Sequence, residues 1–216
     1  MLNKIISWIP SLLGGAKVTV LLTLSSVSAG LILALFLALG KMSKIRLVNR
    51  FCDAYIFFFR GTPLLMQLYF VYYGLPQLSP LFTINSRFLA AFIAFTLNSA
   101  AYTAEIIRAA IESIDRGQFE ASHALGMTYA QTMSLIVVPQ SIRRLIPPVG
   151  NEFIMVLKDA SIVSIIALSD ITKVTRSISS STASALVYIP AMILYLIITA
   201  VFTVVFNRAE KKFSID

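Results

Sequence analysis

The sequence predicts an all-α integral membrane protein with five transmembrane helices. Of its 216 residues, 57% are hydrophobic and only 13% are charged, about half the charged share of soluble domains. The apolar residues also gather in blocks long enough to cross a bilayer. Because there is one cysteine, Cys52, and one histidine, His123, an intrachain disulfide and a cysteine- or histidine-rich metal centre are excluded. We expect one transmembrane domain over residues 1–216.

The first two predicted spans differ in regularity. Residues 18–39 carry no charge and, at about 1.5 Å per residue, form a helix of roughly 33 Å. The preceding segment 1–16 places Trp8 among aliphatic residues and predicts a short interfacial helix. A signal peptide fits badly, because the run is too long and its basic cluster follows it. The second span, 54–75, is interrupted at 60–63 by a polar, proline-containing break that persists only where protein or water covers it.

The remaining spans are expected at 88–107, 146–166 and 186–206. The fourth is the least apolar, because it contains three charged residues. The Ser/Thr-rich segment 169–184 is expected to be an external loop.

The basic residues predict the orientation. The loops after the first and third spans and the C-terminal tail hold eleven of the eighteen Lys and Arg residues. The positive-inside rule therefore predicts an external N-terminus and an internal C-terminus. The net charge of +8 is explained by these loops, so we expect no nucleic-acid partner.

The internal segment between the third and fourth spans predicts a capped helix. Asp115 can cap a helix that begins near Gly117, and Glu120 falls in its first turns, where the helix dipole favours an acid. Gly126 ends this helix, and Pro139 kinks or ends the next one. The exposed face is small and apolar, with Ala121, Ala124 and Leu125. A helical hairpin without a partner fits the same pattern.

At this segment the sequence resembles a known family. Glu120-Ala121-Ser122, then Gly126, Ile136 and Pro139, resemble the E-A-A, G, I-x-x-P signature of the membrane subunits of bacterial ABC importers, with Ser122 where alanine is usual. The runs FRGTPLL (59–65), GQFEA (117–121), GNEF (150–153) and LKD (157–159) are similar to those of polar amino-acid permeases of the histidine, arginine and glutamine type. The resemblance covers nearly the whole chain and implies a type I ABC importer permease with a cytoplasmic coupling helix at 117–127.

The resemblance also implies partners. These are two copies of an ATPase subunit, a second permease subunit (a homodimer is favoured and a heterodimer is possible), an external solute-binding protein, an amino-acid substrate and the lipid bilayer of a bacterial plasma (inner) membrane. The chain has no phosphate-binding loop, so we expect no cofactor in it, with ATP and Mg on the ATPase partner. The chain itself is then not an enzyme. The ATPase contacts implied are Gly117, Glu120, Ala121, Ser122, His123, Ala124 and Gly126.

Polar residues within the spans are candidates for substrate contact. Asn98, Tyr102 and Glu105 share one helix face, and so do Glu152 and Asp159. No basic residue lies three or four positions from Glu152, and a buried unpaired carboxylate favours a cation. The predicted substrate contacts are Glu152, Asp159, Asn98 and Tyr102, with Ser161 or Ser164 as candidates for a substrate carboxylate.

Each of these polar residues also has a structural alternative. Glu105 can pair with Arg108, and Asn98 can bond a neighbouring helix. Lys158 can reach an interface or pair with its neighbour Asp159. For Arg60 we favour capping of the backbone carbonyls at the break over contact with substrate.

The sequence thus predicts ATP-driven import of polar amino acids, with cationic ones favoured. The alternative is a secondary transporter driven by an ion gradient, which usually carries internal repeats; the sequence has no convincing repeat. A membrane enzyme is disfavoured, since one cysteine and one histidine offer little catalytic chemistry.

Overall fold

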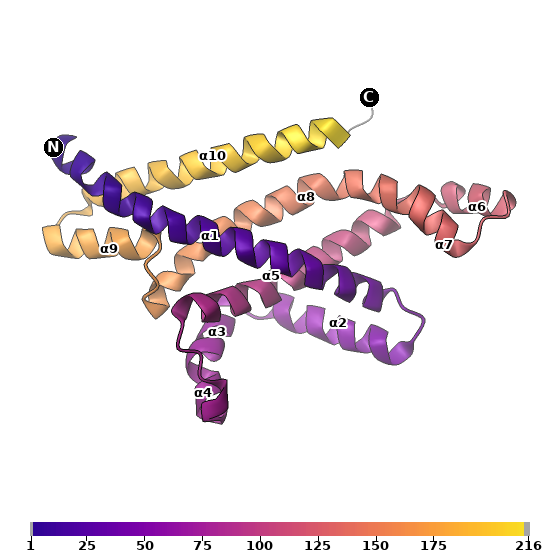
Figure 1. Ribbon diagram of the computed structural model, residues 1–216, viewed down its shortest axis with the longest axis horizontal. Coiled ribbons are helices and arrows are strands. Elements are labelled where there is room, and N and C mark those ends of the chain that lie inside the picture. Colours follow the sequence, from indigo (N-terminus) through magenta and orange to yellow (C-terminus); the bar gives the residue numbers. More distant parts are fainter. Residues whose placement is uncertain (1, 214–216) are drawn as a thin grey trace.

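The computed structural model describes residues 2–213, and those residues form helices and short connections without any strand (Figure 1). This agrees with the predicted all-α fold class. Met1 and residues 214–216 of the predicted domain lie outside the described residues.

The first helix, α1 (Leu2–Lys41), is continuous. The segment predicted as a separate interfacial helix up to Ala16 is therefore the first part of α1. Leu12 and Ala16 are buried against Ile171 and Ala191, so tertiary packing keeps these first turns in line with the rest of the helix.

The predicted break lies between α2 (Arg46–Gly61) and α3 (Leu64–Tyr69), where the chain turns by 102°. Thr62 is extended, with φ −116° and ψ 145°. A residue before proline is pushed out of the helical region, and Pro63 itself has no N–H to continue the ladder. The predicted break is confirmed and is a sharp corner, whereas the predicted span that contains it stays a prediction.

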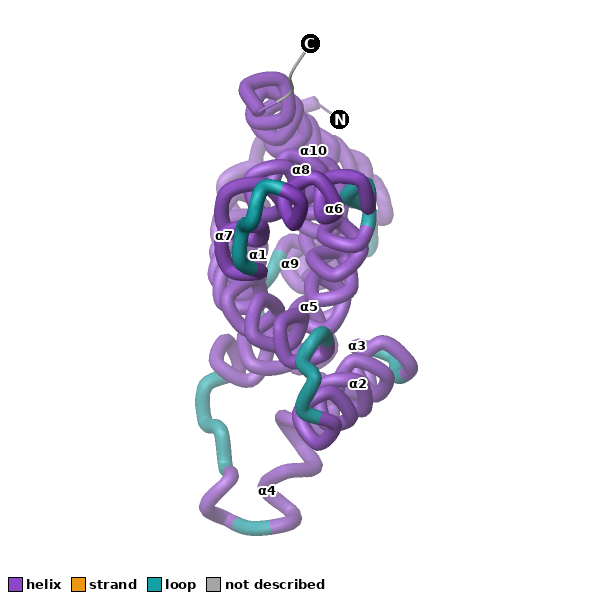
Figure 2. The backbone as a smooth tube through the Cα atoms, turned by 90° about the vertical axis from the view of Figure 1, so that its right-hand side faces the viewer, coloured by secondary structure: helices purple, strands orange, loops and turns teal. Residues whose placement is uncertain are grey.

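After the corner the chain forms an arm that projects from the bundle in both views (Figures 1 and 2). Beyond α3 it contains a π-helical turn (Phe70–Gly74), α4 (Leu75–Leu78) and a 3-10 turn (Pro80–Phe82).

The long helix α5 (Arg87–Glu112) packs closely against α1. Gly30 of α1 lies so near α5 that a Cβ there would be 3.3 Å from the Thr96 carbonyl oxygen. The facing side chains of α5 are small, including Ala100 and Ala104, which are fully buried. Small residues let two membrane helices approach, which gives van der Waals contact without a hydrophobic driving force.

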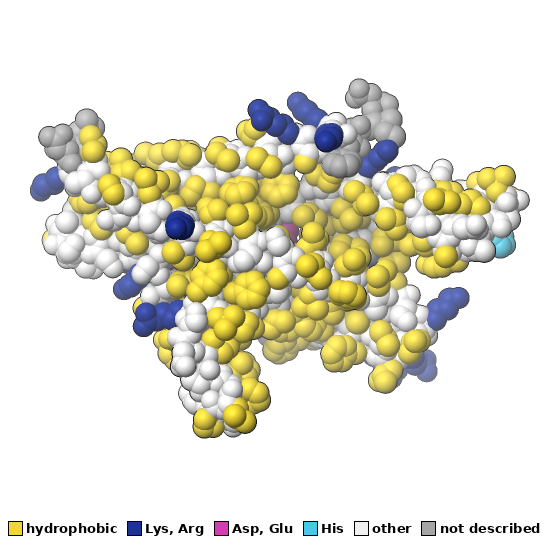
Figure 3. All heavy atoms as spheres, viewed as in Figure 1, with side chains coloured by type: hydrophobic (Ala, Val, Ile, Leu, Met, Phe, Trp, Pro, Cys, Tyr) yellow, Lys and Arg dark blue, Asp and Glu magenta, His cyan; other side chains and the backbone are white. Residues whose placement is uncertain are grey.

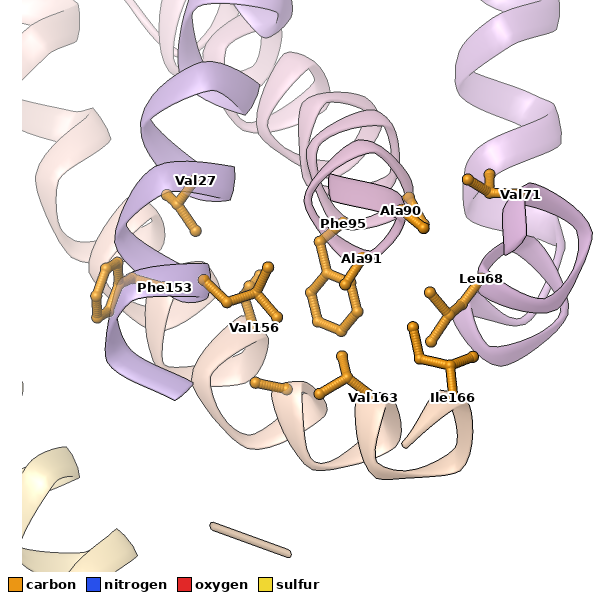
Figure 4. Close-up of a cluster of buried hydrophobic side chains, with 13 residues drawn as sticks. Val27, Leu68, Val71, Ala90, Ala91, Phe95, Phe153, Val156, Val163 and Ile166 are labelled. Carbon is orange, nitrogen blue, oxygen red and sulfur yellow. The ribbon is translucent and has the colours of Figure 1, made fainter. Parts of the chain in front are cut away.

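The main apolar cluster joins five segments of the chain. Figure 4 shows Val27, Leu68, Phe95, Val156 and Val163 pointing toward one another from α1, α3, α5, α8 and the turn after α8. This cluster fixes the corner and α8 against the same side of α5.

The internal segment folds as predicted up to its proline. Asp115 caps α6 (Arg116–Ala124), and Gly126 follows with φ +76°. The next helix starts with α7 (Tyr129–Thr132), passes through a π-helical turn (Met133–Val137) and continues as α8 (Val138–Asp159).

Pro139 therefore does not end the helix that contains it. It occupies the start of α8, directly after the π-helical turn Met133–Val137. A π-turn changes the hydrogen-bond register, so the N–H that proline lacks is accommodated without a break.

The prediction of a loop at 169–184 is wrong over most of its length. After a 3-10 turn (Ala160–Ile166), residues Ile171–Thr182 form the helix α9. Asp170 caps it by accepting hydrogen bonds from the backbone N–H groups of Thr172 and Lys173, both at 2.9 Å. Ile171 and Thr175 are buried one turn apart, so packing outweighs the low helix propensity of a Ser/Thr-rich run.

A short 3-10 turn (Ala185–Val187) leads into the last helix, α10 (Tyr188–Phe213). By length and composition three described helices can span a membrane, or four if the bent α2–α3 pair is one span. The predicted five spans and their orientation stay predictions.

Different segments of the chain gather at the two ends of the long axis of the molecule. The start of α1 lies near α9, whereas α6, α7 and the α1–α2 connection lie at the opposite end (Figure 1). On the face drawn in Figure 3, hydrophobic atoms cover the middle, and most Lys and Arg atoms lie along the outline, with one group near the C-terminal end of α10.

Candidate functional site

A cavity of about 450 Å³ opens at the corner between α2 and α3. Four of the predicted substrate residues, Asn98, Tyr102, Glu152 and Asp159, line it. They come from α5 and α8, whose polar faces thus converge as the spacing predicted. The other lining residues come from the corner and from α8 and the turn after it: Arg60, Gly61, Thr62, Pro63, Leu64, Leu65, Met155, Val156 and Ile162.

The two carboxylates of the cavity have no ion-pair partner in the described part of the chain. Glu152 is 7% exposed. The suggested pair between Asp159 and Lys158 is not formed, although the two are neighbours in sequence. Asp159, in contrast, is exposed. A desolvated carboxylate without a partner is costly, so a cation bound beside Glu152 would be stabilised in this cavity.

Asn98 has a structural role in addition to its place in the cavity. Its amide donates to the Phe59 carbonyl and to the Gln67 side-chain oxygen, both at 3.0 Å. Gln67, which is buried, donates in turn to the Phe59 carbonyl at 2.9 Å and to the Thr62 hydroxyl at 2.8 Å. The alternative that Asn98 bonds a neighbouring helix is confirmed. These bonds satisfy backbone groups that the corner leaves open.

The expectation that Arg60 caps the backbone carbonyls at the break is wrong. Those carbonyls are bonded by Gln67 and Asn98, and the Tyr102 hydroxyl lies 3.5 Å from the Arg60 carbonyl. The Arg60 guanidinium lies over the Tyr102 ring, 5.4 Å from its centroid, and 3.7 Å from a Glu105 oxygen.

Glu105 is the centre of an ion-pair network rather than a lining residue of the cavity. Lys41 donates to one of its oxygens at 2.9 Å and Arg108 donates to the other at 2.8 Å. Lys41 also pairs with Asp53 at 2.8 Å. The predicted Glu105–Arg108 pair is confirmed, and the network additionally ties the α1–α2 hairpin to α5.

Ser161 is not among the residues that line the cavity. The helix tightens to a 3-10 turn after Asp159, and with three residues per turn the side chain that follows Asp159 on the same face is Ile162. Ser164 is buried with an unpartnered hydroxyl and is also absent from the lining. This change of helical period is not marked in the sequence.

The apolar lining and the role of the corner were not predicted from the sequence. Met155 and Val156 follow Glu152 by three and four positions, and Asp159 follows by seven, so helical periodicity was a sufficient signal for this face of α8. The contribution of Thr62 depends on the 102° corner, which the sequence only marks as a break.

The predicted coupling residues lie on the short helix α6 and directly after it. The Asp115 side chain accepts a hydrogen bond of 2.6 Å from the Gly117 backbone N–H. The helix ends with hydrogen bonds from the Gly126 and Met127 N–H groups to earlier carbonyls, at 2.9 and 3.0 Å. The predicted residues whose surface is exposed are Gly117, Glu120, Ala121, His123, Ala124 and Gly126.

Ser122 differs from the other predicted coupling residues because it is 1% exposed. Its hydroxyl donates to the Phe119 carbonyl at 2.9 Å and accepts from the Thr132 hydroxyl at 3.0 Å. Its side chain thus joins α6 to α7 and does not face a partner, in contrast to the expectation. The hydroxyl that departs from the alanine of the signature has a specific bonding partner.

Comparison with known proteins also indicates a membrane component of a transport system. Residues 26–215 match the family described as "Binding-protein-dependent transport system inner membrane component". The chain belongs to the amino-acid ABC importer permeases. As a permease of this family, it is a transport component with membrane-spanning helices.

Three similar proteins span almost the whole permease. It is 40% identical to the arginine transport system permease protein ArtQ of Bacillus subtilis (strain 168), covering 94% of this chain and 93% of that one. It is 38% identical to the L-cystine transport system permease protein TcyL of the same organism, covering 98% and 90%. A solved structure described as an amino acid ABC transporter with histidines superposes with a TM-score of 0.91 at 38% identity and covers 97% of both chains. The type I importer fold predicted for the permease is thereby confirmed.

Proposed function

We propose that this permease imports polar amino acids with a preference for cationic ones, and that the substrate occupies the cavity between the α2–α3 corner, α5 and α8. The observation that carries the proposal is the pair of unpartnered carboxylates, Glu152 and Asp159, in its lining. An ammonium or guanidinium group would supply the missing cation. The cavity volume of about 450 Å³ falls in the range of small-molecule sites.

The other lining residues fit an amino acid as well. Asn98 and Tyr102 offer polar groups, and Leu64, Met155 and Ile162 offer apolar surface for the stem of a long side chain. Of the two Bacillus subtilis relatives described above, one is named for arginine and the other for L-cystine. In a transporter of neutral amino acids the same carboxylates would bind only the α-ammonium group, so cationic preference depends on both acids acting at once.

The energy for import would come from partner subunits. In the proposed complex, two copies of an ATPase subunit bind two permeases through the helix α6 and Gly126, and hydrolyse ATP with Mg. A homodimer of this permease is favoured, and a heterodimer with a related permease is the alternative. An external solute-binding protein would deliver the amino acid at the outer face of a bacterial plasma membrane, with the N-terminus outside.

The proposed cycle is a two-state switch of the permease dimer. ATP binding closes the ATPase pair, draws the two coupling helices together and opens the outer side, and hydrolysis reverses the change. The rigid capping of α6 by Asp115 and the α6–α7 hydrogen bond at Ser122 support this idea, because a displacement of α6 would be transmitted to α8.

Substrate binding is tested by uptake of radiolabelled L-arginine into proteoliposomes that contain the complete transporter. Glu152→Gln should reduce the uptake rate about tenfold or more, because a charge-assisted contact is lost. Glu210→Gln, at an exposed acid of α10, is the matched control and should keep the uptake rate. Unchanged uptake of every amino acid tested in the Glu152 variant would show that the site is misplaced.

Coupling is tested by replacing Gly126 with Trp. The variant should assemble with the ATPase subunits yet lose the dependence of ATP hydrolysis on the external binding protein. The uptake rate of the unaltered transporter should depend on ATP at the side of the membrane that carries the ATPase subunits. It should not depend on the membrane potential. Uptake that instead follows an imposed ion gradient without ATP would favour the secondary transporter.

A further inference from the structure

Arg60 lies between two cavities of the permease. It lines the first cavity together with Glu152 and Asp159, and it lines a second one of about 350 Å³ with Lys41 and Asp53. Among the residues that line the first cavity it is the one Lys or Arg. The first cavity therefore has two carboxylates and one guanidinium within the same walls.

The guanidinium of Arg60 is weakly held. Its side chain is 43% exposed, and its nearest carboxylate, Glu105, is 3.7 Å away, beyond hydrogen-bond distance. Its guanidinium carbon lies 5.4 Å from the centroid of the Tyr102 ring, and within the described residues its N–H groups donate no hydrogen bond. An arginine has five such donors, so Arg60 has donors available for a ligand.

Glu105 does not depend on Arg60. Its two oxygens already accept hydrogen bonds from Lys41 at 2.9 Å and from Arg108 at 2.8 Å. If the Arg60 guanidinium turned toward the first cavity, Glu105 would keep its two closer cations. The move would therefore cost little electrostatic energy, because the longest of three contacts is the one that is lost. Lys41 and Arg108, in contrast, are committed to short ion pairs.

We propose that Arg60 binds the α-carboxylate of the transported amino acid and so selects amino acids against the corresponding amines. The planar fork of a guanidinium matches a carboxylate through two parallel hydrogen bonds. In this arrangement Glu152 and Asp159 bind the ammonium and any side-chain cation, and Arg60 binds the opposite charge at the other wall. The inference rests on the proposed substrate cavity and adds the group that recognises the anionic end.

The test compares an amino acid with its decarboxylated analogue. Equilibrium binding to the purified permease–ATPase complex is measured without the external binding protein, using three pairs: L-arginine and agmatine, L-lysine and cadaverine, and L-glutamine and 4-aminobutanamide. Arg60→Gln should lower the affinity for the amino acid that binds best about tenfold to a hundredfold. The affinity for the matched amine should stay unchanged or increase, since a positive charge has been removed from the cavity.

The opposite signs of the two effects separate recognition from mere structural damage. A variant that only deforms the corner would lower the affinities for the amino acid and for the amine together, and that result would overturn the proposal. Arg87→Gln, at an exposed arginine that lines neither cavity, is the control and should change neither affinity. Arg60→Lys should keep part of the preference for the amino acid.

The failure of this proposal differs from that of the substrate cavity. Glu152→Gln could lower the affinities for amino acid and amine alike while Arg60→Gln does not change them in opposite directions. That result would support the substrate cavity and contradict the proposed role of Arg60. If neither variant changes binding, or if the complex binds no amino acid of the three pairs, both proposals fall.

Discussion

The Thr132 hydroxyl donates a 3.0 Å hydrogen bond to the Ser122 hydroxyl, and both side chains are buried. This bond links α6 to α7. It also gives a physical reason for a serine at a position where importers of this family usually have alanine.

We predict that Ser122→Ala lowers the free energy of unfolding by about 1–3 kcal/mol, because it leaves the buried Thr132 hydroxyl without its partner. The double variant Ser122→Ala, Thr132→Val should be more stable than Ser122→Ala alone, since the unpaired hydroxyl is gone. Thermal unfolding of the purified complex provides the measurement. Effects that simply add in the double variant would show that the two hydroxyls are not coupled.

Two adjacent glycines of α1 should respond in opposite directions to alanine. A Cβ on Gly15 would lie 2.8 Å from the Asp170 carbonyl oxygen, whereas a Cβ on Gly14 would meet nothing within 4 Å. Gly15→Ala should destabilise the permease by about 1–3 kcal/mol through overpacking against the start of α9. Gly14→Ala should raise stability by up to about 1 kcal/mol, because alanine is the better helix former.

The melting temperatures of the two glycine variants give the comparison without any functional assay. A shift of about 2–4 °C per kcal/mol is expected for a chain of this size. Equal shifts of the same sign in both variants would contradict the close approach of α1 and α9.

Gln67 should be essential for the stability of the corner. Gln67→Leu keeps the volume but removes the donors to the Phe59 carbonyl and to the Thr62 hydroxyl. We expect a loss of about 2–3 kcal/mol in the free energy of unfolding, because Gln67 is buried and the polar groups left behind lose their partner. Gln77→Leu, at an exposed amide of α4 in the same arm, is the control and should stay within about 0.5 kcal/mol of the parent. Similar melting temperatures for both variants would contradict this role.

Glu105 and Glu112 both pair with Arg108 but should differ in importance. The Glu105 side chain is 16% exposed and bonds cations from two helices, whereas the Glu112 side chain is 55% exposed. Glu105→Gln should cost about 2 kcal/mol, since it removes charge-assisted bonds to Lys41 and Arg108. Glu112→Gln should cost less than about 1 kcal/mol, as expected for a surface pair. Thermal unfolding at low and high salt would check both, and a larger loss in the Glu112 variant would reverse our ranking.

Much of the candidate site follows from spacing along single helices. Asn98 and Tyr102 are four residues apart, and Glu152 and Asp159 are seven apart, so each pair shares a face whatever the tertiary structure. The capped start of α6 and its end at Gly126 are likewise local, because they depend on side chains and φ values within a few residues.

Other features could not be obtained in this way. The helix α9 depends on the burial of Ile171 and Thr175 against other segments, which outweighs a composition that favours a loop. The exclusion of Ser161 from the cavity results from a local switch to a 3-10 turn. Arg60 does not cap the corner carbonyls as expected, because the side chains of Gln67 and Asn98 reach the corner from α3 and α5 and bond there instead.

The sequence by itself determined the class of this protein: its apolar blocks, its basic loops and the EAS–G–IxxP pattern are properties of consecutive residues. Only the tertiary structure decided which polar groups remain without a partner. Glu105 is paired with Lys41 of α1 in addition to Arg108 of its own helix, whereas Glu152 has no such pair among the described residues, although both are acids within helices of the bundle. Whether a charge is compensated depends on what lies across a few ångströms of space, and residues distant along the chain supply that neighbour.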